Sequence, residues 1–280
     1  MIELTDLTFG YTQKKPIFRR LSLTLHPGTL YGLLGKNGAG KSSLLRLMGG
    51  MLYAETGQIT VAGFDPARRQ AAFLQELYFI PEEIYLPPVS LQHYINTMGA
   101  FYPKFNESQF RRYLTEFDIP QDQKLTAMSY GQKKKVIISF ALATNTRVLI
   151  MDEPTNGLDI PSKSQFRKIV SSALTPDRLV LISTHQVRDL DNLIDAVIVV
   201  DESEILLNHS LTEISDRLLF DTVSTVTRPD RILYTESSLR GQAVVMENPA
   251  KEDSKVDLER LFNTVLTSRA RIKTLFHESV

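Results

Sequence analysis

A glycine-rich segment that ends in a lysine and a serine is the strongest chemical signal in the sequence. It matches the pattern GxxxxGK(S/T) and begins at Gly35. Glycines let the backbone curl around an anion with its N–H groups inward, and a following helix N-terminus adds partial positive charge. In such a loop the lysine reaches the β and γ phosphates and the serine hydroxyl binds Mg²⁺. We expect ATP phosphates to be bound by Gly35, Asn37, Gly38, Ala39, Gly40, Lys41, Ser42 and Ser43.

The flanking sequence favours this interpretation over an ordinary strand-to-helix turn. An apolar run over residues 29–34 predicts a strand before the loop, and residues 42–48 carry apolar side chains at helical spacing after it. The four fixed positions match somewhere in a chain of this length about one time in a hundred. A phosphate loop is therefore predicted between a strand and a helix.

A second apolar strand, over residues 148–151, ends in two carboxylates, Asp152 and Glu153, and is stopped by Pro154. Ligands of parallel sheets collect at the carboxyl ends of the strands, so both side chains are expected beside the phosphate loop. Asp152 is then a candidate Mg²⁺ ligand, and Glu153 and Lys41 are candidate catalytic residues. Alone, an Asp-Glu-Pro turn is more often a solvated strand end. His185, after the next apolar strand, is a candidate γ-phosphate sensor at the same edge.

A polar turn over residues 129–132 precedes a helical pattern and a cluster of three lysines at 133–135. Ser129 followed by Gln132 predicts a capping box, which satisfies the first amides of that helix. A capped helix start with an exposed Gly131 and neighbouring lysines also predicts an anion site. One nucleotide hardly needs two such sites from a single subunit.

The remaining pattern predicts the elements that position these residues. Residues 1–34 alternate as half-buried strands, residues 56–64 predict another strand, and a helical block is expected at about 88–140. Buried strands over 148–151 and 179–183 alternate with helices over 136–144 and 164–174, which favours a mostly parallel sheet covered on both faces. The predicted fold is α/β, with an N-terminal antiparallel subdomain.

Beyond about residue 220 the predicted strands become shorter and more polar. We expect a main domain over residues 1–219 and a small α+β accessory domain over 220–280, with strands over 231–236 and 242–247. One long helix is predicted from Leu258 to Phe276, because apolar residues recur there at helical spacing. Its stripe either packs on the short strands or pairs two copies of the chain, and the sequence leaves both open.

Composition limits the class of protein. The chain has 280 residues, 42% of them hydrophobic, and a formal net charge of +0, so no global field favours a nucleic-acid partner. It has no cysteine, which excludes disulfides and thiolate metal sites. No apolar run approaches the roughly 20 residues that cross a bilayer, and a signal peptide is not evident. A cytoplasmic location is expected, with any membrane span supplied by another chain.

Together these motifs resemble those of ATP-binding-cassette (ABC) ATPase subunits, over residues 1 to about 215. Residues 128–132 resemble the family signature LSGGQ, residues 156–159 its D-loop, His185 its switch histidine, and Tyr11 the aromatic that stacks on adenine. The resemblance implies a head-to-tail dimer, homodimeric or heterodimeric, with two ATP molecules between the subunits. Ser129, Gly131 and Gln132 then act on the partner's nucleotide, and Asp159 helps connect the two sites.

Two departures from the family pattern stand out. Met128 and Tyr130 replace the usual leucine and glycine of the signature, while Ser129 is kept. Glu82 stands where the family usually has glutamine after a proline. The resemblance implies that Glu82 contacts Mg²⁺-bound water, although its charge adds repulsion beside the phosphates.

The resemblance implies an ATP-hydrolysing transporter subunit, similar to bacterial exporter-type subunits, that lies on the inner face of the membrane and powers a separately encoded permease. The permease is expected to dock on the helical block, where Tyr85, Tyr94, Phe101 and Tyr102 either line a groove or pack in its core. A soluble ABC ATPase of an assembly machine, for example for iron–sulfur clusters, is the alternative. A small-molecule kinase is the third and weakest hypothesis.

Overall fold

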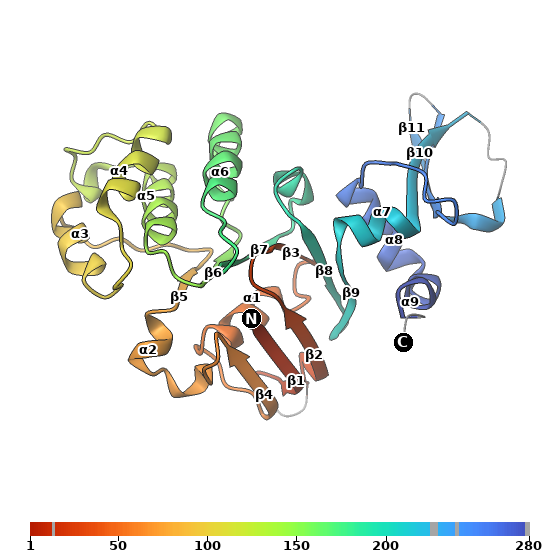
Figure 1. Cartoon of the computed structure of the whole chain (residues 1–280), viewed down its shortest axis with the longest axis horizontal. Coiled ribbons are helices and arrows are strands. Elements are labelled where there is room, and N and C mark those ends of the chain that lie inside the picture. Colours follow the sequence, from red (N-terminus) through yellow and green to blue (C-terminus); the bar gives the residue numbers. More distant parts are fainter. Residues whose placement is uncertain (13–14, 225–228, 239–240, 278–280) are drawn as a thin grey trace.

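A six-stranded sheet forms the centre of the molecule in the computed structural model, which describes residues 1–12, 15–224, 229–238 and 241–277 (Figure 1). Its strand order is β5-β6-β7-β3-β8-β9, and every neighbouring pair is parallel except β8 and β9. The predicted mostly parallel sheet is therefore confirmed. The strands are β5 (Leu77–Ile80), β6 (Val148–Asp152), β7 (Leu179–Thr184), β3 (Leu30–Leu34), β8 (Ala196–Asp201) and β9 (Glu204–Ser210).

The two faces of this sheet belong to two different cores. Alternate residues of a strand point to opposite faces, so Leu33 and Ile150 lie in one core, and Leu34 and Met151 lie in the other. Burial on both faces explains why these strands are apolar throughout. The first core is closed by helix α1 (Lys41–Met48) and by an antiparallel sheet of order β2-β1-β4. Its strands are β1 (Ile2–Phe9), β2 (Phe18–Leu25) and β4 (Thr56–Val61), the last shorter than the predicted 56–64.

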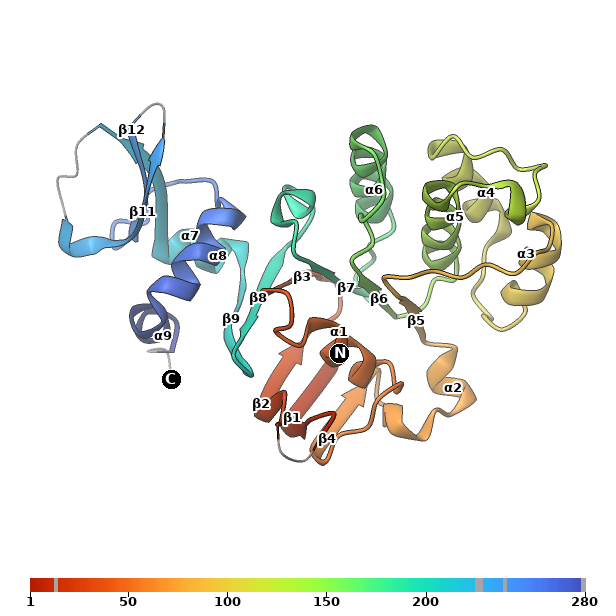
Figure 2. The same ribbon diagram turned by 180° about the vertical axis from the view of Figure 1, so that it is seen from behind.

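The second core contains the helical block, α3 (Leu91–Gly99), α4 (Glu107–Glu116) and α5 (Tyr130–Ala143), around the buried ring of Phe140. Helix α6 (Ile160–Ser172) stands beside it in Figures 1 and 2. Tyr94 is buried and lies 5.1 Å from Phe140, centroid to centroid. The remaining short helices are α2 (Ala71–Leu74), α7 (Leu211–Arg217), η1 (Pro66–Arg68), η2 (Leu125–Ala127), η3 (Val187–Leu190) and η4 (Pro229–Arg231).

The C-terminal appendage is a three-stranded antiparallel sheet with two helices, and it lies beside β8 and β9 (Figure 2). Its strands are β10 (Leu218–Val223), β11 (Ile232–Ser238) and β12 (Gly241–Glu247), so the sheet starts just before the boundary expected at residue 220. The prediction of one long helix is wrong. Helices α8 (Leu258–Thr267) and α9 (Arg269–His277) are separated by Ser268, whose backbone leaves the helical region and whose hydroxyl donates to the Leu233 carbonyl at 2.6 Å.

The apolar stripe of α8 and α9 is buried within this chain. Leu261, Val265, Ile272 and Phe276 are at most 5% exposed and share one core with Leu207 of β9. This packing favours the first of the two alternatives left by the sequence. Among the described residues, no helix combines the length and the apolar character that a bilayer crossing requires.

Candidate nucleotide-binding site

The phosphate loop lies between β3 and α1, as predicted, and its conformation depends on glycine. Gly38 and Gly40 adopt φ of 82° and 97°, which side chains disfavour. A Cβ on Gly35 would lie 2.6 Å from the Val200 carbonyl oxygen of β8. Gly40 also begins α1 without a side chain to cap it, so the first amides of the helix remain available to an anion.

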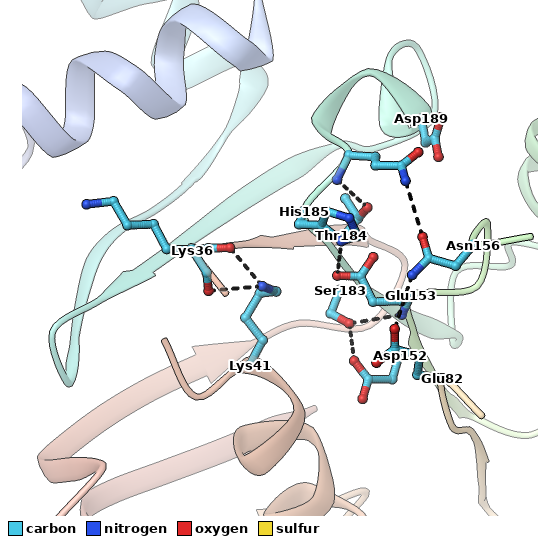
Figure 3. Close-up of polar contacts among 12 residues, drawn as sticks. Lys36, Lys41, Glu82, Asp152, Glu153, Asn156, Ser183, Thr184, His185 and Asp189 are labelled. Atoms are coloured by element: carbon cyan, nitrogen blue, oxygen red, sulfur yellow. Dashed lines mark hydrogen bonds and ion pairs between the residues drawn. The ribbon is translucent and has the colours of Figure 1, made fainter. Parts of the chain in front are cut away.

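The side chain of Lys41, the first residue of α1, folds back onto this loop. Its ammonium donates to the Gly35 carbonyl at 2.7 Å and to the Lys36 carbonyl at 3.3 Å (Figure 3). Burial lowers the pKa of Lys41, while the nearby carboxylates of Glu153 and Asp152 oppose that shift. The structure therefore brings the predicted lysine and the two predicted carboxylates to one place. Next to Lys41 in the helix, Ser42 is half-buried.

Ser183 holds the two carboxylate residues at the carboxyl ends of β6 and β7. Asp152 lies opposite Ser183 in the parallel register, and the Ser183 hydroxyl donates to Asp152 Oδ1 at 2.5 Å. The Glu153 amide donates to the Ser183 carbonyl oxygen at 3.1 Å and lies 3.2 Å from the hydroxyl oxygen. Glu153 has φ of 47°, an uncommon value that this amide contact helps to maintain.

Glu153 and His185 form a close pair. Glu153 Oε1 lies 2.8 Å from His185 Nδ1 (Figure 3), and the glutamate is 5% exposed. Its other oxygen, Oε2, is buried and has no hydrogen-bond partner within the described ranges. A buried carboxylate oxygen without a partner is costly, so a hydrogen-bond donor that reaches it, such as water, is bound favourably. The arrangement suits a general base oriented by a histidine.

Glu82 lies beside the same site and contacts the predicted D-loop. Its Oε1 accepts a hydrogen bond from Asn156 Nδ2 at 3.2 Å, and Asn156 Oδ1 accepts one from Gln186 Nε2 at 3.4 Å (Figure 3). The Glu82 carboxylate also acts on the Lys41 ammonium and opposes the lowering of its pKa by burial. Glu82 is thus placed beside the phosphate loop.

The predicted capping box at the start of α5 is confirmed. Ser129 Oγ accepts from the Gln132 amide at 3.2 Å, and Gln132 Oε1 accepts from the Ser129 amide at 2.9 Å. Ser129 is exposed, which leaves its hydroxyl accessible to another molecule, whereas Gly131 is half-buried rather than exposed.

The expectation that the three neighbouring lysines form one cationic cluster is wrong. Lys134 is fully buried, and its ammonium donates to the carbonyls of Glu153 at 2.9 Å and Asn156 at 3.0 Å. Lys135 points elsewhere and donates to the Phe117 carbonyl at 3.3 Å. Successive helical residues point about 100° apart, so consecutive lysines cannot share one face.

The two departures from the family pattern contact each other. The Tyr130 hydroxyl donates to the Glu82 carbonyl at 3.1 Å. A Cβ added to Gly157 would lie 3.2 Å from the Tyr130 ring, so this glycine gives the ring room. Asp159 caps α6, since its Oδ1 accepts from the Ser162 amide at 2.9 Å, and hydrogen bonding to the Ser162 side chain and amide lowers the pKa of Asp159.

Tyr11 borders a hollow next to the phosphate loop. Its hydroxyl lies 3.1 Å from Ser43 Oγ, and the residue is 61% exposed. The hollow measures about 380 Å³ and is lined by Tyr11, Ile17, Gly38, Ala39, Glu202 and Ser203, among others. A purine and its ribose fit a space of this size.

Sequence reasoning missed several residues that border or support this site. Ser183 and Lys134 act on the backbone or carboxylate of the predicted catalytic residues, and Glu202 and Ser203 line the hollow beside Tyr11. Ser183 had a signal, because it is a polar residue at the carboxyl end of the apolar strand that precedes His185. Glu202 and Ser203 had none, because the hairpin that carries them was not predicted.

A phosphate loop that faces a carboxylate pair at one sheet edge defines a nucleoside-triphosphatase of the phosphate-loop class. A family model described as ABC transporter matches residues 18–156. The linearmycin resistance ATP-binding protein LnrL of Bacillus subtilis (strain 168) is 30% identical over 235 residues, covering 81% of this chain and 75% of that protein. The chain therefore belongs to the family of ABC transporter ATP-binding proteins, and it hydrolyses ATP.

Solved structures share the fold. A structure described as the ATP-binding subunit of an ABC transporter has a TM-score of 0.69 at 24% identity and covers 76% of this chain and 91% of its own. The cassette MJ0796, solved as a dimer in a post-hydrolysis state with ADP and Pi, has a TM-score of 0.63 at 19% identity, covering 75% of this chain and 99% of its own. The relatives are transporter subunits, so the comparisons support transport and not the assembly-machine alternative.

Proposed function

We propose that this subunit hydrolyses ATP in a head-to-tail dimer and thereby powers a separate membrane permease. The observation that carries the catalytic part is the pair of Glu153 and His185, with one glutamate oxygen buried and unpartnered beside the phosphate loop. The exposed Ser129 hydroxyl at a capped helix start supports the dimer, because it leaves an anion-binding end free for a partner's nucleotide.

In the proposed mechanism the nucleotide base lies on Tyr11, and the phosphates lie in the loop over residues 35–43. Lys41 moves from its carbonyl contacts to the β and γ phosphates, where its charge-assisted hydrogen bonds replace the water that the phosphates lose on binding. Glu153 takes a proton from the attacking water, and His185 orients the carboxylate and contacts the γ-phosphate. Ser129, Gly131 and Gln132 of the partner subunit close the site, and Asp159 connects the two sites.

The residues present fit a magnesium ion. Asp152 offers a carboxylate that is 1% exposed and is oriented by Ser183, and the Ser42 hydroxyl lies at the start of α1. Within the described ranges, no three His, Asp or Glu side chains cluster tightly enough to bind a metal by themselves, which suits an ion that keeps waters and phosphate ligands. Bound there, Mg²⁺ neutralises charge on the β and γ phosphates. Glu82 is proposed to contact its water shell.

An apolar groove that runs from α2 and β5 to the end of α3 in the helical block supports the permease partner. It measures about 540 Å³ and is lined by Met51, Leu74, Phe79, Met98, Phe101 and Tyr102, among others. Phe101 is 62% exposed there, and an exposed apolar groove suits an amphipathic helix of another protein. Of the other two aromatics considered for this role, Tyr94 packs in the core, and Tyr85 is exposed outside the groove lining. Docking there places the subunit at the cytoplasmic face of the membrane.

The substitution Glu153→Gln tests the mechanism. It keeps the shape of the side chain but removes the base, so we expect phosphate release to fall by about 10² to 10⁴-fold. ATP binding and ATP-dependent dimerisation should survive, as measured by calorimetry and by light scattering. The exposed Glu55→Gln, outside the site, serves as the control and should hydrolyse ATP at the parental rate. Parental hydrolysis by Glu153→Gln would refute the general base, and a monomer with ATP would refute the sandwich.

A further inference from the structure

The hollow beside Tyr11 has a second wall, which comes from the β8–β9 edge of the central sheet. Its N-terminal wall consists of Tyr11, Ile17 and the loop residues Gly38 and Ala39. The opposite wall consists of Glu202 and Ser203, the two residues that join β8 to β9. A nucleotide base placed on Tyr11 therefore has the β8–β9 turn on its other side.

This turn is conformationally strained. Asp201 pairs with Glu204, so the connection has only two central residues, and these have φ of 47° and 74°. Two-residue hairpins of this kind favour glycine and asparagine at the central positions, and side chains there cost free energy of order 1 kcal/mol or more each. Such a turn needs contacts from outside the hairpin to keep its shape.

Arg269 supplies those contacts from the C-terminal appendage. It is the first residue of α9, and its Nη1 donates to Glu202 Oε2 at 2.7 Å while Nη2 donates to Asp201 Oδ2. Asp201 is 5% exposed, so this part of the contact is shielded from solvent. A guanidinium fork that binds two carboxylates fixes both their positions and their orientations.

The strand that leads into this turn also approaches the phosphate loop closely. Val200, which precedes Asp201 in β8, places its carbonyl oxygen where a Cβ on Gly35 would lie 2.6 Å away. Without Arg269, two uncompensated carboxylates would stand close to the site of a nucleotide that itself carries several negative charges. Loosening of the wall and repulsion of the nucleotide act in the same direction, toward weaker binding.

We propose that Arg269 is a positioning residue for the nucleotide, through which the appendage sets the affinity of this subunit for ATP. The inference rests on the proposed function in one respect, namely that the hollow beside Tyr11 receives the base and ribose. Arg269 acts there through Asp201 and Glu202 and does not contact the reacting phosphate. It should therefore affect binding of ATP and ADP alike and leave the chemical step unchanged.

The test uses the full chain and the variant Arg269→Met. We expect the dissociation constants of ATP and ADP, measured by calorimetry without magnesium, to rise about 3 to 10-fold, a change that corresponds to the loss of a charge-assisted contact. At saturating ATP the rate of phosphate release should equal that of the parent. Arg269→Lys keeps the charge but not the fork, so its affinities should fall between those of the parent and of Arg269→Met, and it provides the same test if the methionine variant does not fold.

The matched control is Arg271→Met, on the same helix. Arg271 donates to Glu247 and to the carbonyls of Ile232 and Asp230, away from the hollow, so nucleotide affinity should stay at the parental value. In Arg269→Met, adding Glu202→Gln removes one unpaired charge and should recover part of the affinity. A purely structural role would instead weaken binding equally in the Arg269 and Arg271 variants, which would overturn the proposal.

Lys41→Met distinguishes an error in the proposed nucleotide site from an error in the role proposed for Arg269. If this variant binds ATP as tightly as the parent, the proposed nucleotide site itself is wrong. If Lys41→Met weakens binding and Arg269→Met does not, the nucleotide site stands and the inference about the appendage is wrong.

Discussion

The buried ammonium of Lys134 connects the start of α5 with the segment that carries the proposed general base. It donates to the carbonyls of Glu153 and Asn156 and lies 5.9 Å from the centre of the Tyr130 ring. Burial lowers the pKa of Lys134, while the nearby carboxylates, Glu82 first, oppose that shift. Burying this ammonium costs free energy, which its hydrogen bonds offset. These hydrogen bonds fix the distance between the polar turn at 129–132 and the proposed active site.

Lys134→Met removes both hydrogen bonds at similar side-chain volume. We expect the turnover number for ATP to fall about 10 to 100-fold with little change in KM, because Glu153 is then held less accurately relative to the attacking water. Lys134→Gln keeps one donor and should lie between the methionine variant and the parent. The measurement is steady-state phosphate release. Lys133→Met, one residue earlier and without these contacts, is the control, and equal turnover in both methionine variants would contradict this role.

At the residue scale, the sequence was sufficient for features that lie close together in the chain. The phosphate loop and the pair Asp152 and Glu153 are local patterns, and the structure places Lys41 beside both carboxylates. The separate environments of Lys134 and Lys135 could not be predicted in this way. The two residues have the same chemistry, and only the rotation of α5 against residues 153–156 decides which one is buried.

At the scale of elements, the helical block is packed around tyrosines whose phenols are shielded from water. Burial raises the pKa of Tyr102 to about 12, and it also raises the pKa of Tyr78 and of Tyr94. The rings of Tyr78, Tyr94 and Tyr102 all lie within 6.2 Å of the Phe140 ring, centroid to centroid. The block therefore depends on these phenols staying neutral.

The chain should lose stability between pH 10 and pH 12. Below pH 10 the phenols are protonated in both the folded and the unfolded states, whereas above it the unfolded state ionises first, because the folded pKa of Tyr102 is raised from 10.0 to about 12. Urea unfolding at a series of pH values measures the loss. Tyr102→Phe should reduce the loss of stability between pH 10 and pH 12, whereas Tyr85→Phe, at a residue 81% exposed, should not. A stability that stays constant to pH 12 would contradict the shielding.

Strand β8, a buried apolar run, was missed despite a strong local signal, whereas two other missed features have weak ones. Strand β5 has four residues, which is short for a pattern of alternation. The β8–β9 hairpin turns at Glu202 and Ser203 rather than at the asparagine or glycine that usually marks a two-residue turn. The turn lacks these residues and is instead stabilised by hydrogen bonds from Arg269, which is far away in the sequence. The hairpin therefore depends on tertiary structure.

At the scale of the whole molecule, the appendage and the cassette share one hydrophobic core. Leu261 and Val265 of α8 belong to the same cluster as Leu34 of β3 and Phe140 of α5. Polar contacts cross the boundary as well, since Arg188, close after His185, pairs with Glu259 of α8 at 2.8 Å. The appendage is thus packed onto the catalytic part rather than joined to it by a linker.

A substitution inside the appendage should therefore destabilise the entire chain. Leu261 is 0% exposed, and Leu261→Ala removes its contacts and leaves a cavity, so the free energy of unfolding should fall by about 2 to 5 kcal/mol. Because the core is continuous, we expect one cooperative transition at a lower temperature, seen equally by circular dichroism and by loss of ATP binding. The control Leu74→Ala, at a residue of α2 that is 36% exposed and lines the apolar groove, should shift the transition far less. Two separate transitions, with ATP binding lost at the parental temperature, would show that the appendage folds independently of the nucleotide site.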